Sequence, residues 1–279
     1  MLSPNQREQF AHDGYIVLPD FKSAQAIAAV RRRASEIVND FDPAAQRPIF
    51  STRDQLQTTD DYFLGSDNTI RCFFEEEAFD QHGALRQDKS LSINKIGHAL
   101  HDLDPVFDAF SRDPKLAAVA RDLGLMNPQL WQSMYIFKQP GIGGEVGWHQ
   151  DATFFETDPI TVTTFWFALE DATVDNGCLW VEPGGQRGPL RERFVRNGGE
   201  IKMEALDATP WPDNNSAVAL EASAGTLVCL HGLLPHYSAP NRSPVSRHAY
   251  TLHATDAAAT YSRHNWIQRD AAVPVRGFV

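Results

Sequence analysis

A histidine and an aspartate two residues apart form a pair whose types and spacing suit metal chemistry. His149 and Asp151 lie in the segment 147–151, GWHQD. Side chains two residues apart in an extended segment project to the same face, so both could bind one cation. With 10 histidines in the chain, one such pair also arises readily by chance, and its meaning depends on the rest of the sequence.

A third ligand is available downstream, in the segment 230–236, LHGLLPH. Here an apolar strand runs into a turn and offers two histidines, His231 and His236, between which the residues alone favour His236 only slightly. Two histidines and one carboxylate on one face of an octahedron leave three positions open, an arrangement typical of Fe(II) oxygenases. The sequence therefore predicts a centre that binds Fe(II), a co-substrate and O2.

A nearby cation, Arg247, fits the same hypothesis. A strand pair joined by the loop 237–246 would bring Arg247 close to His236. The co-substrate 2-oxoglutarate brings a distal carboxylate into a largely dry pocket, where an unpaired charge is costly and a guanidinium can pair with it. Each residue also has an ordinary interpretation, as a core histidine, a turn-forming aspartate or a surface arginine. A metal centre explains them better together.

The elements that must position these residues lie mainly in the second half of the chain. Segments rich in aromatic and β-branched residues, bounded by Gly, Pro, Asn or Asp, predict strands. They span 132–138, 162–169, 177–181, 225–230 and 247–253. This pattern favours a mainly β fold with flanking helices, a sandwich or jelly-roll barrel with the helices packed outside. The stretch 184–215 is predicted to be a long loop, positioned to act as a substrate-facing lid.

The first half carries more helical patterns. Ser3, Pro4 and Gln6 predict a capped helix start, and Gly14 its end, followed by a buried strand over 15–18. A second helix is predicted from near Ser23, with Ile27, Val30, Ala34 and Ile37 at helical spacing. The segments 92–100 and 114–123 are also predicted to be helical. Residues 40–90 are mixed and polar and give no clear assignment.

Length and composition restrict the class of protein. The 279 residues are expected to form a single domain, 1–279, with a helical portion over roughly 1–128 and a β core over roughly 129–279. The net charge of −11 argues against nucleic-acid or anionic-membrane partners. Because no apolar stretch is long enough to span a bilayer and no secretory pattern is present, we expect a cytoplasmic protein. Its three widely spaced cysteines are expected to be reduced thiols.

The sequence resembles the phytanoyl-CoA dioxygenase family over nearly its whole length. The resemblance is closest to the branch called phytanoyl-CoA dioxygenase domain-containing proteins. It rests on SINKIGHALH (92–101), QSMYIFKQP (132–140), GGEV (143–146), HQDA (149–152), EDAT (170–173), NGCLW (176–180), the His-Gly pair before His236, and RHAYTLH (247–253). Membership implies a double-stranded β-helix, a jelly-roll fold like that of cupins, and an Fe(II)- and 2-oxoglutarate-dependent dioxygenase.

The resemblance also implies roles for individual residues. It makes His149, Asp151 and His236 the iron ligands, in preference to His231. It assigns Arg247 and Ser238 to the distal carboxylate of 2-oxoglutarate, and adds three further contacts of the co-substrate pocket, Lys95, Met134 and Trp166. Without the family, Met134 and Trp166 resemble ordinary strand-core residues and Lys95 a lysine on a helix surface.

The chain departs from the family at one turn and keeps a diagnostic carboxylate. Many members have Pro-Gly-Ser-His where this chain has PGGQ at 183–186, so the family's substrate contacts at this turn are not carried over to this chain. Because Asp151 is present, the halogenases that lose this carboxylate are not the expected class. We predict oxidation, by default hydroxylation, of a small organic molecule with release of succinate and CO2. The alternative is a cupin-like metal-binding barrel independent of 2-oxoglutarate, which would have no use for Arg247 and Ser238.

Overall fold

The computed structural model describes residues 1–43, 48–50, 61–197, 200–213 and 216–278. Its helices are α1 (Pro4–Asp13), α2 (Ala24–Asp40), α3 (Asp61–Leu64), α4 (Leu100–Leu103), α5 (Pro105–Ser111) and α6 (Pro114–Asp122). The strands of the first half are β1 (Tyr15–Leu18), β2 (Ile49–Phe50), β3 (Ile70–Glu75), β4 (Ile93–His98) and β5 (Pro128–Ile136). Those of the second half are β6 (Val146–His149), β7 (Thr157–Asp158), β8 (Thr163–Ala168), β9 (Leu179–Val181), β10 (Glu192–Asn197), β11 (Glu200–Ala205), β12 (Val218–Leu220), β13 (Leu227–His231), β14 (His236–Ser238), β15 (Ala249–Asp256) and β16 (Thr260–Tyr261).

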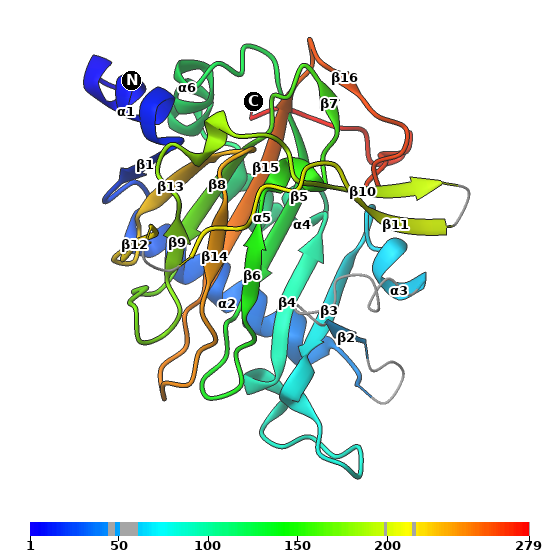
Figure 1. Ribbon diagram of the computed structural model, residues 1–279. Helices are drawn as coiled ribbons and strands as arrows, with labels where there is room; N and C mark the ends of the chain where they lie inside the picture. The colour runs from blue at the N-terminus through cyan, green and yellow to red at the C-terminus, as the bar shows by residue number, and fades with distance from the viewer. Residues whose placement is uncertain (44–47, 51–60, 198–199, 214–215, 279) are drawn as a thin grey trace.

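Two sheets of unequal size form the body of the fold (Figure 1). The larger sheet has the order β1-β13-β8-β15-β5-β4-β3-β2, and the smaller has the order β12-β9-β14-β6. Neighbouring strands are antiparallel except for the β2–β3 pair. In Figure 1 the smaller sheet lies in front of the larger sheet, and α2 lies behind the larger sheet. The N-terminal part therefore supplies strands to the larger sheet as well as helices that cover it.

Side chains along the central strands of the larger sheet point alternately to its two faces. Tyr250 and Leu252 of β15 belong to the main hydrophobic core, together with Phe167 of β8 and Val30 of α2. The residues between them in sequence, such as Thr251, line a pocket on the opposite face. Successive side chains of a strand point to opposite faces, so one strand serves both the helix-side core and the pocket.

The predicted N-terminal helices and the strand between them are present. Ser3 caps α1 by accepting a hydrogen bond from the Gln6 amide, and Gln6 completes the capping box. Gly14 ends this helix in the left-handed region, with φ of 82°, a conformation that glycine adopts without steric cost. In α2 the buried residues are Ile27, Val30, Ala34 and Val38, so Val38 is buried rather than the expected Ile37. Helix α6 and the strands predicted in the second half are also present.

Two of the predicted elements are wrong. The segment 92–100 is strand β4 over Ile93–His98, paired with both β3 and β5, and not a helix. All six of its residues are buried, and a strand buried on both faces lacks the alternation that separates strands from helices. The predicted loop 184–215 contains the hairpin β10–β11; its residues 198–199 and 214–215 lie outside the described residues.

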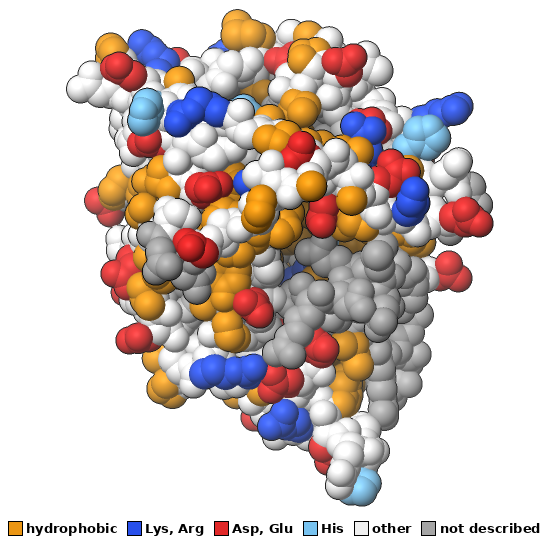
Figure 2. All heavy atoms as spheres, in the orientation of Figure 1, with side chains coloured by type: hydrophobic (Ala, Val, Ile, Leu, Met, Phe, Trp, Pro, Cys, Tyr) orange, Lys and Arg blue, Asp and Glu red, His pale blue; other side chains and the backbone are white. Residues whose placement is uncertain are grey.

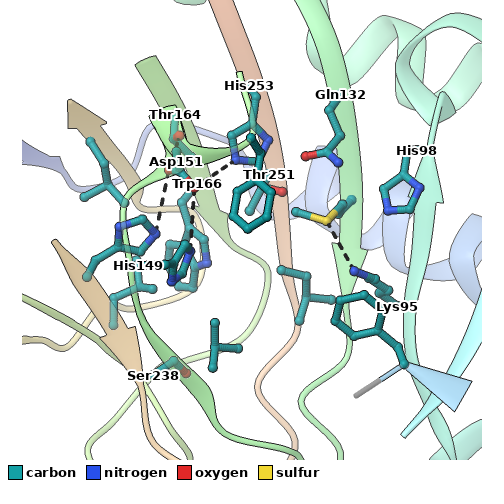
Figure 3. Close-up of a pocket in the computed structure, with 18 of the residues that line it drawn as sticks. Lys95, His98, Gln132, His149, Asp151, Thr164, Trp166, Ser238, Thr251 and His253 are labelled. Carbon is teal, nitrogen blue, oxygen red and sulfur yellow. Dashed lines mark hydrogen bonds and ion pairs between the residues drawn. The ribbon is translucent and has the colours of Figure 1, made fainter. Parts of the chain in front are cut away.

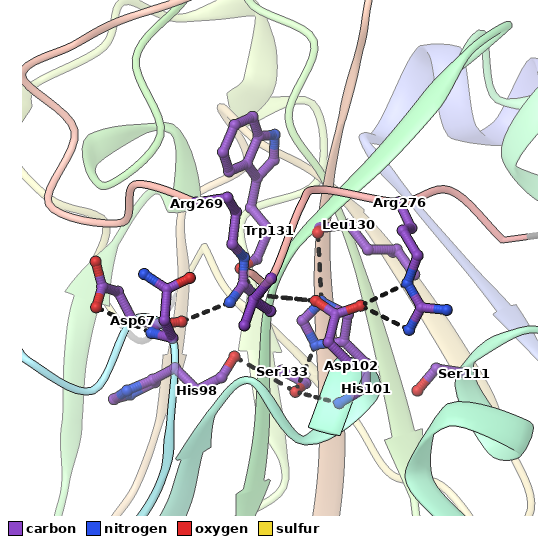
Figure 4. A network of polar contacts seen from close by, with 12 residues as sticks. Asp67, His98, His101, Asp102, Ser111, Leu130, Trp131, Ser133, Arg269 and Arg276 are labelled. Carbon is purple, nitrogen blue, oxygen red and sulfur yellow. Dashed lines mark hydrogen bonds and ion pairs between the residues drawn. The ribbon is translucent and has the colours of Figure 1, made fainter. Parts of the chain in front are cut away.

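A buried carboxylate attaches the C-terminal segment to the body of the fold (Figure 4). Asp102 of α4 forms ion pairs with Arg112 at 2.7 Å, Arg276 at 3.0 Å and Arg269 at 3.5 Å. Arg269 also donates to the carbonyls of Asp67 and Trp131, at 2.6 Å each. Through these contacts the network fixes the segment that carries Trp266 into the pocket wall.

On the face shown in Figure 2, the acidic and basic side chains of the described residues are interspersed around an apolar area and form no continuous basic patch. In the part of the chain that the structure describes, none of the helices has the length and apolar character needed to cross a bilayer.

Candidate metal centre

Strands β6 and β14 are neighbours in the smaller sheet and bring the predicted ligands together. His149 ends β6 and His236 begins β14, and the two residues are direct partners in the antiparallel pair. Asp151 follows in a short 3-10 turn, Asp151–Thr153. The ligand atoms of all three side chains lie within 4.8 Å of one another. This arrangement of two imidazoles and one carboxylate on one side of a pocket suits a divalent transition metal.

Backbone carbonyls decide which nitrogen of each histidine is free. Nδ1 of His149 lies 2.9 Å from the carbonyl oxygen of Gly147, and Nδ1 of His236 lies 3.0 Å from that of Leu234. A carbonyl can only accept, so Nδ1 carries the proton in both rings. The Nε2 lone pairs are then available toward Asp151, as required of histidines that bind a metal.

The carboxylate of Asp151 is held by two neighbours. The Thr164 hydroxyl donates to Oδ2 at 2.5 Å, and His253 Nε2 lies 3.5 Å from Oδ1. Burial opposes ionisation of Asp151, but the nearby His236 and His253 outweigh it and hold its pKa far below the usual range. Burial, together with His236, lowers the pKa of His149 to about 4. Near neutral pH the site thus combines a charged carboxylate with a neutral imidazole, the states that bind a cation.

His231, the rival ligand, faces another part of the fold. It ends β13, where it pairs with Thr163. Its Nδ1 accepts a hydrogen bond from the Leu233 amide at 3.1 Å, and its ring lies 6.1 Å from the ring of Phe10 in α1. The geometry therefore groups His236, and not His231, with His149 and Asp151.

A buried cation lies in the same pocket without an anionic partner in the described part of the chain. Arg247 is 2% exposed; its Nε donates to the Gly177 carbonyl at 3.0 Å and its Nη2 to Ser238 Oγ at 3.2 Å. Its Nη1 has no hydrogen-bond partner among the described residues. Burial lowers the pKa of Arg247 to about 10. Since an unpaired buried charge is costly, a bound carboxylate would offset this cost.

The other predicted co-substrate contacts line the same pocket (Figure 3). Lys95 is 6% exposed and lies on β4, so the ordinary interpretation as a lysine on a helix surface does not hold. Its Nζ lies 3.9 Å from Met134 Sδ and 3.1 Å from the centre of the Phe50 ring. The guanidinium of Arg247 lies 5.5 Å from the ring centre of Trp166. Burial holds the pKa of Lys95 well below its usual value.

Sequence reasoning missed several polar residues of the pocket. Thr251 and His253 lie on β15 beyond Arg247, and Gln132 and His98 lie on β5 and β4. Arg247, Thr251 and His253 are separated by even intervals, and this period of two was visible in RHAYTLH. His98 gave no such signal, because β4 was taken for a helix, and Gln132 was placed in a predicted strand without a role.

The remaining walls of the pocket are mainly aromatic. Phe154 and Phe155 follow the metal-binding turn, Phe194 comes from β10, and Phe63 and Trp266 close another side. Apolar walls with a few converging polar groups are the usual features of a small-molecule site. The donor set and the unpaired Arg247 Nη1 thus fit a divalent iron with a bound dicarboxylate.

Comparisons with known proteins agree with this chemistry. A family model described as phytanoyl-CoA dioxygenase matches residues 10–249. "Phytanoyl-CoA dioxygenase" of Arabidopsis thaliana is 46% identical over 269 residues, which cover 96% of this chain and 94% of that protein. "Phytanoyl-CoA dioxygenase domain-containing protein 1" of Bos taurus is 45% identical over 282 residues, which cover 98% of this chain and 97% of that protein. The resemblance noted in the sequence is confirmed.

Solved structures confirm the fold class. The non-heme alpha-ketoglutarate-dependent carbocyclase SnoK from nogalamycin biosynthesis superposes with a TM-score of 0.67 at 20% identity, covering 94% of this chain and 87% of that one. EctD from S. alaskensis, solved with bound Fe, gives a TM-score of 0.64 at 22% identity, with coverages of 96% and 82%. At these identities the likeness shows a shared fold, the predicted double-stranded β-helix with flanking helices.

Proposed function

Because the chain belongs to the phytanoyl-CoA dioxygenase family and is an Fe(II)- and 2-oxoglutarate-dependent dioxygenase, we propose that it hydroxylates a small organic molecule. In this reaction 2-oxoglutarate is converted to succinate and CO2 while one oxygen atom of O2 enters a C–H bond of the substrate. The other oxygen atom enters succinate. Iron with 2-oxoglutarate supplies the oxidising power, and the protein supplies binding, orientation and a shielded site.

The observation that carries this proposal is the buried Arg247 beside the histidine–aspartate cluster. Its Nη1 lacks a partner among the described residues, and its Nη2 is oriented by Ser238. A barrel that held a metal only for structure or sensing would have to bear the cost of this unpaired cation without benefit. A dicarboxylate bound between the metal and Arg247 removes that cost.

Each protein group then has a defined task. His149, Asp151 and His236 hold the iron, with the two imidazoles fixed by the carbonyls of Gly147 and Leu234. Thr164 orients the carboxylate of Asp151 through its hydrogen bond to Oδ2.

Arg247 and Ser238 bind the distal carboxylate of 2-oxoglutarate, and Lys95, Met134 and Trp166 complete the walls of the co-substrate pocket. The support for these three is their place in the lining of one pocket that also holds the metal-binding cluster. The aromatic side chains around that cluster exclude water from it, which strengthens the electrostatic contacts inside and protects the reacting groups.

Arg247→Ala provides the test, because iron binding and co-substrate binding should separate in this variant. Truncating one partner of a buried charge pair costs roughly 2–5 kcal/mol, which at ~1.4 kcal/mol per decade weakens 2-oxoglutarate binding about 30-fold to a few thousand-fold. Arg247→Lys should recover only part of the 2-oxoglutarate affinity, since an ammonium lacks the planar fork of the guanidinium. Anaerobic titration of the Fe(II) protein with 2-oxoglutarate, followed by its charge-transfer absorption, measures the affinity.

The control is Arg242→Ala, since Arg242 is exposed and bonded to Glu77 and the Gly141 carbonyl outside the cluster. This variant should bind 2-oxoglutarate as the wild type does. Unchanged affinity in Arg247→Ala would remove Arg247 from the site. A wild-type protein that binds iron but no 2-oxoglutarate would favour the cupin-like alternative. Succinate formation against a metabolite library then identifies the substrate.

A further inference from the structure

The pocket continues past the metal-binding cluster to a second polar area on β4 and β5, formed by His98 and Gln132. Figure 3 shows these two side chains on the side of the pocket opposite His149 and Asp151, with Thr251 and His253 between. His98 is fully buried, with 0% exposure, and its Nε2 has no hydrogen-bond partner among the described residues. A buried polar atom without a partner is costly, so its presence at a binding pocket calls for an explanation.

The hydrogen bonds of Ser66 determine what His98 offers to a ligand. Ser66 Oγ lies 2.5 Å from the Phe63 carbonyl oxygen and 2.7 Å from His98 Nδ1. The single hydroxyl proton must point to the carbonyl, which can only accept, so Ser66 must accept from Nδ1. Nδ1 therefore carries the ring proton, and Nε2 presents a bare lone pair.

The surroundings keep His98 in this neutral form. Burial, followed by the positive charges of Lys95 and Arg269, holds the pKa of His98 well below the usual value. Among the described residues, the Lys95 ammonium contacts Met134 Sδ and aromatic rings and does not use the lone pair of His98. At neutral pH His98 Nε2 is thus an acceptor in need of a donor.

The side chains next to His98 restrict the shape of a ligand that could bind there. Gln132 is buried, its side-chain amide makes no hydrogen bond to the described residues, and it adjoins Ser133, the register partner of His98. The rings of Phe63 and Trp266 are stacked 4.6 Å apart, and both approach His98 edge-on, at 5.4 and 5.1 Å. A polar corner beside flat apolar walls suits a ring that carries an N–H or O–H group.

We propose that His98 Nε2 accepts a hydrogen bond from an N–H or O–H group of the primary substrate, a compact cyclic molecule whose polar end lies at His98 and Gln132. The opposite end of the ring then faces the metal-binding cluster. This inference rests on the proposed function, since it names the substrate class of the same site.

Matched pairs of small ring compounds test the proposal: indole against 1-methylindole, and 2-naphthol against 2-methoxynaphthalene. Each pair differs by methylation of its only donor. Binding is measured by saturation-transfer NMR on protein loaded with Zn(II), in place of Fe(II), and with 2-oxoglutarate. We expect the donor-bearing member to bind about 10-fold more tightly, the size of effect that one hydrogen bond to an otherwise unsatisfied acceptor can supply.

His98→Phe should abolish this preference while it leaves 2-oxoglutarate affinity unchanged, and His82→Phe, at an exposed histidine, should keep both. No preference in the wild type, or a preference that persists in His98→Phe, would overturn the proposal. The wild-type 2-oxoglutarate titration separates the two hypotheses: absence of co-substrate binding rejects the proposed function, whereas binding without donor preference rejects this inference alone.

A second measurement does not depend on the folding of His98→Phe. In protein labelled with 15N at histidine, the Nε2 resonance of His98 should have the shift of an unprotonated ring nitrogen and move upfield with indole but not with 1-methylindole. Ser66→Ala should weaken the tautomer preference, because it removes the acceptor of the Nδ1 proton. A protonated Nε2 in the wild type would contradict the proposed acceptor role.

Discussion

At the scale of single residues, two backbone carbonyls prepare the histidines of this protein for metal binding. Gly147 and Leu234 each lie two residues before the histidine that they contact, so each carbonyl and its ring belong to one short segment. The resulting free Nε2 atoms face Asp151, whose oxygens lie 3.7 Å from both. The ligand set is thus preorganised by local hydrogen bonds before any metal arrives.

The first residue-scale prediction concerns ligand identity. His149→Ala, Asp151→Ala and His236→Ala should each lose stoichiometric Fe(II), because removal of one of three protein ligands leaves a weak two-point site. His231→Ala is the matched control and should retain the metal, since its ring packs near Phe10. Metal analysis after desalting measures the outcome. Iron kept by His236→Ala and lost by His231→Ala would reverse the assignment.

At the scale of elements, the hairpin β10–β11 replaces the loop that the sequence suggested. One residue of the hairpin, Phe194, is 3% exposed and lies 5.7 Å from the Phe154 ring, next to the turn that carries Asp151. Arg193 pairs with Glu156 at 2.9 Å, and the amide of Arg191 donates to Gln150. The hairpin and the residue before it therefore contact the metal-binding segment through an apolar side chain, an ion pair and a hydrogen bond.

We predict that Phe194→Ala lowers substrate turnover more than iron binding, because Phe194 lines the pocket but offers no ligand atom. Val195→Ala is the control, since the next residue of a strand points to the opposite face. The readouts are succinate formation with the metabolite that the wild type oxidises, and metal content after desalting. Turnover equal to that of the wild type would argue against a substrate-facing role for the hairpin.

At the scale of the whole molecule, the Asp102 network joins elements that are far apart in the chain. His101, Arg112, Arg269 and Arg276 all contact one carboxylate, which is 3% exposed. Burial opposes its ionisation, but His101, Arg269 and Arg112 prevail and hold the pKa of Asp102 well below its ordinary value. The network therefore stabilises the folded state only while Asp102 is charged.

Asp102→Asn should lower the free energy of unfolding at pH 7 by roughly 3–5 kcal/mol, the cost of breaking a buried ion pair. Asp108→Asn, at a side chain 37% exposed, should cost at most about 1 kcal/mol. Because the folded pKa of Asp102 is depressed, its contribution is complete above the unfolded pKa of about 3.9 and is lost as pH falls below it.

Urea unfolding at a series of pH values measures this contribution. The difference between the wild type and Asp102→Asn should be constant above about pH 5 and shrink in more acidic solution. Equal losses for the Asp102 and Asp108 variants, or a difference that does not change with pH, would contradict the role given to the network.

The sequence by itself determined what depends on neighbours along the chain. The capping box at Ser3 and Gln6 and the left-handed Gly14 follow from local hydrogen bonds and backbone sterics. The strands of the second half follow from residue type and bounding turns, and the one-face spacing of His149 and Asp151 from the geometry of extended chain. Recognisable motifs then supplied the family and the choice of His236.

Only the tertiary structure decided what depends on segments distant in sequence. Strand β4 was predicted as a helix because burial on both faces removed its alternation, so the buried position of His98 was missed and only the family resemblance pointed Lys95 to the pocket. His253 reaches Asp151 across about 100 residues of chain through the β15–β8 pairing. Such contacts arise when strands from distant parts of the chain pair, and a pattern read along one segment contains no information on which strand will lie beside it.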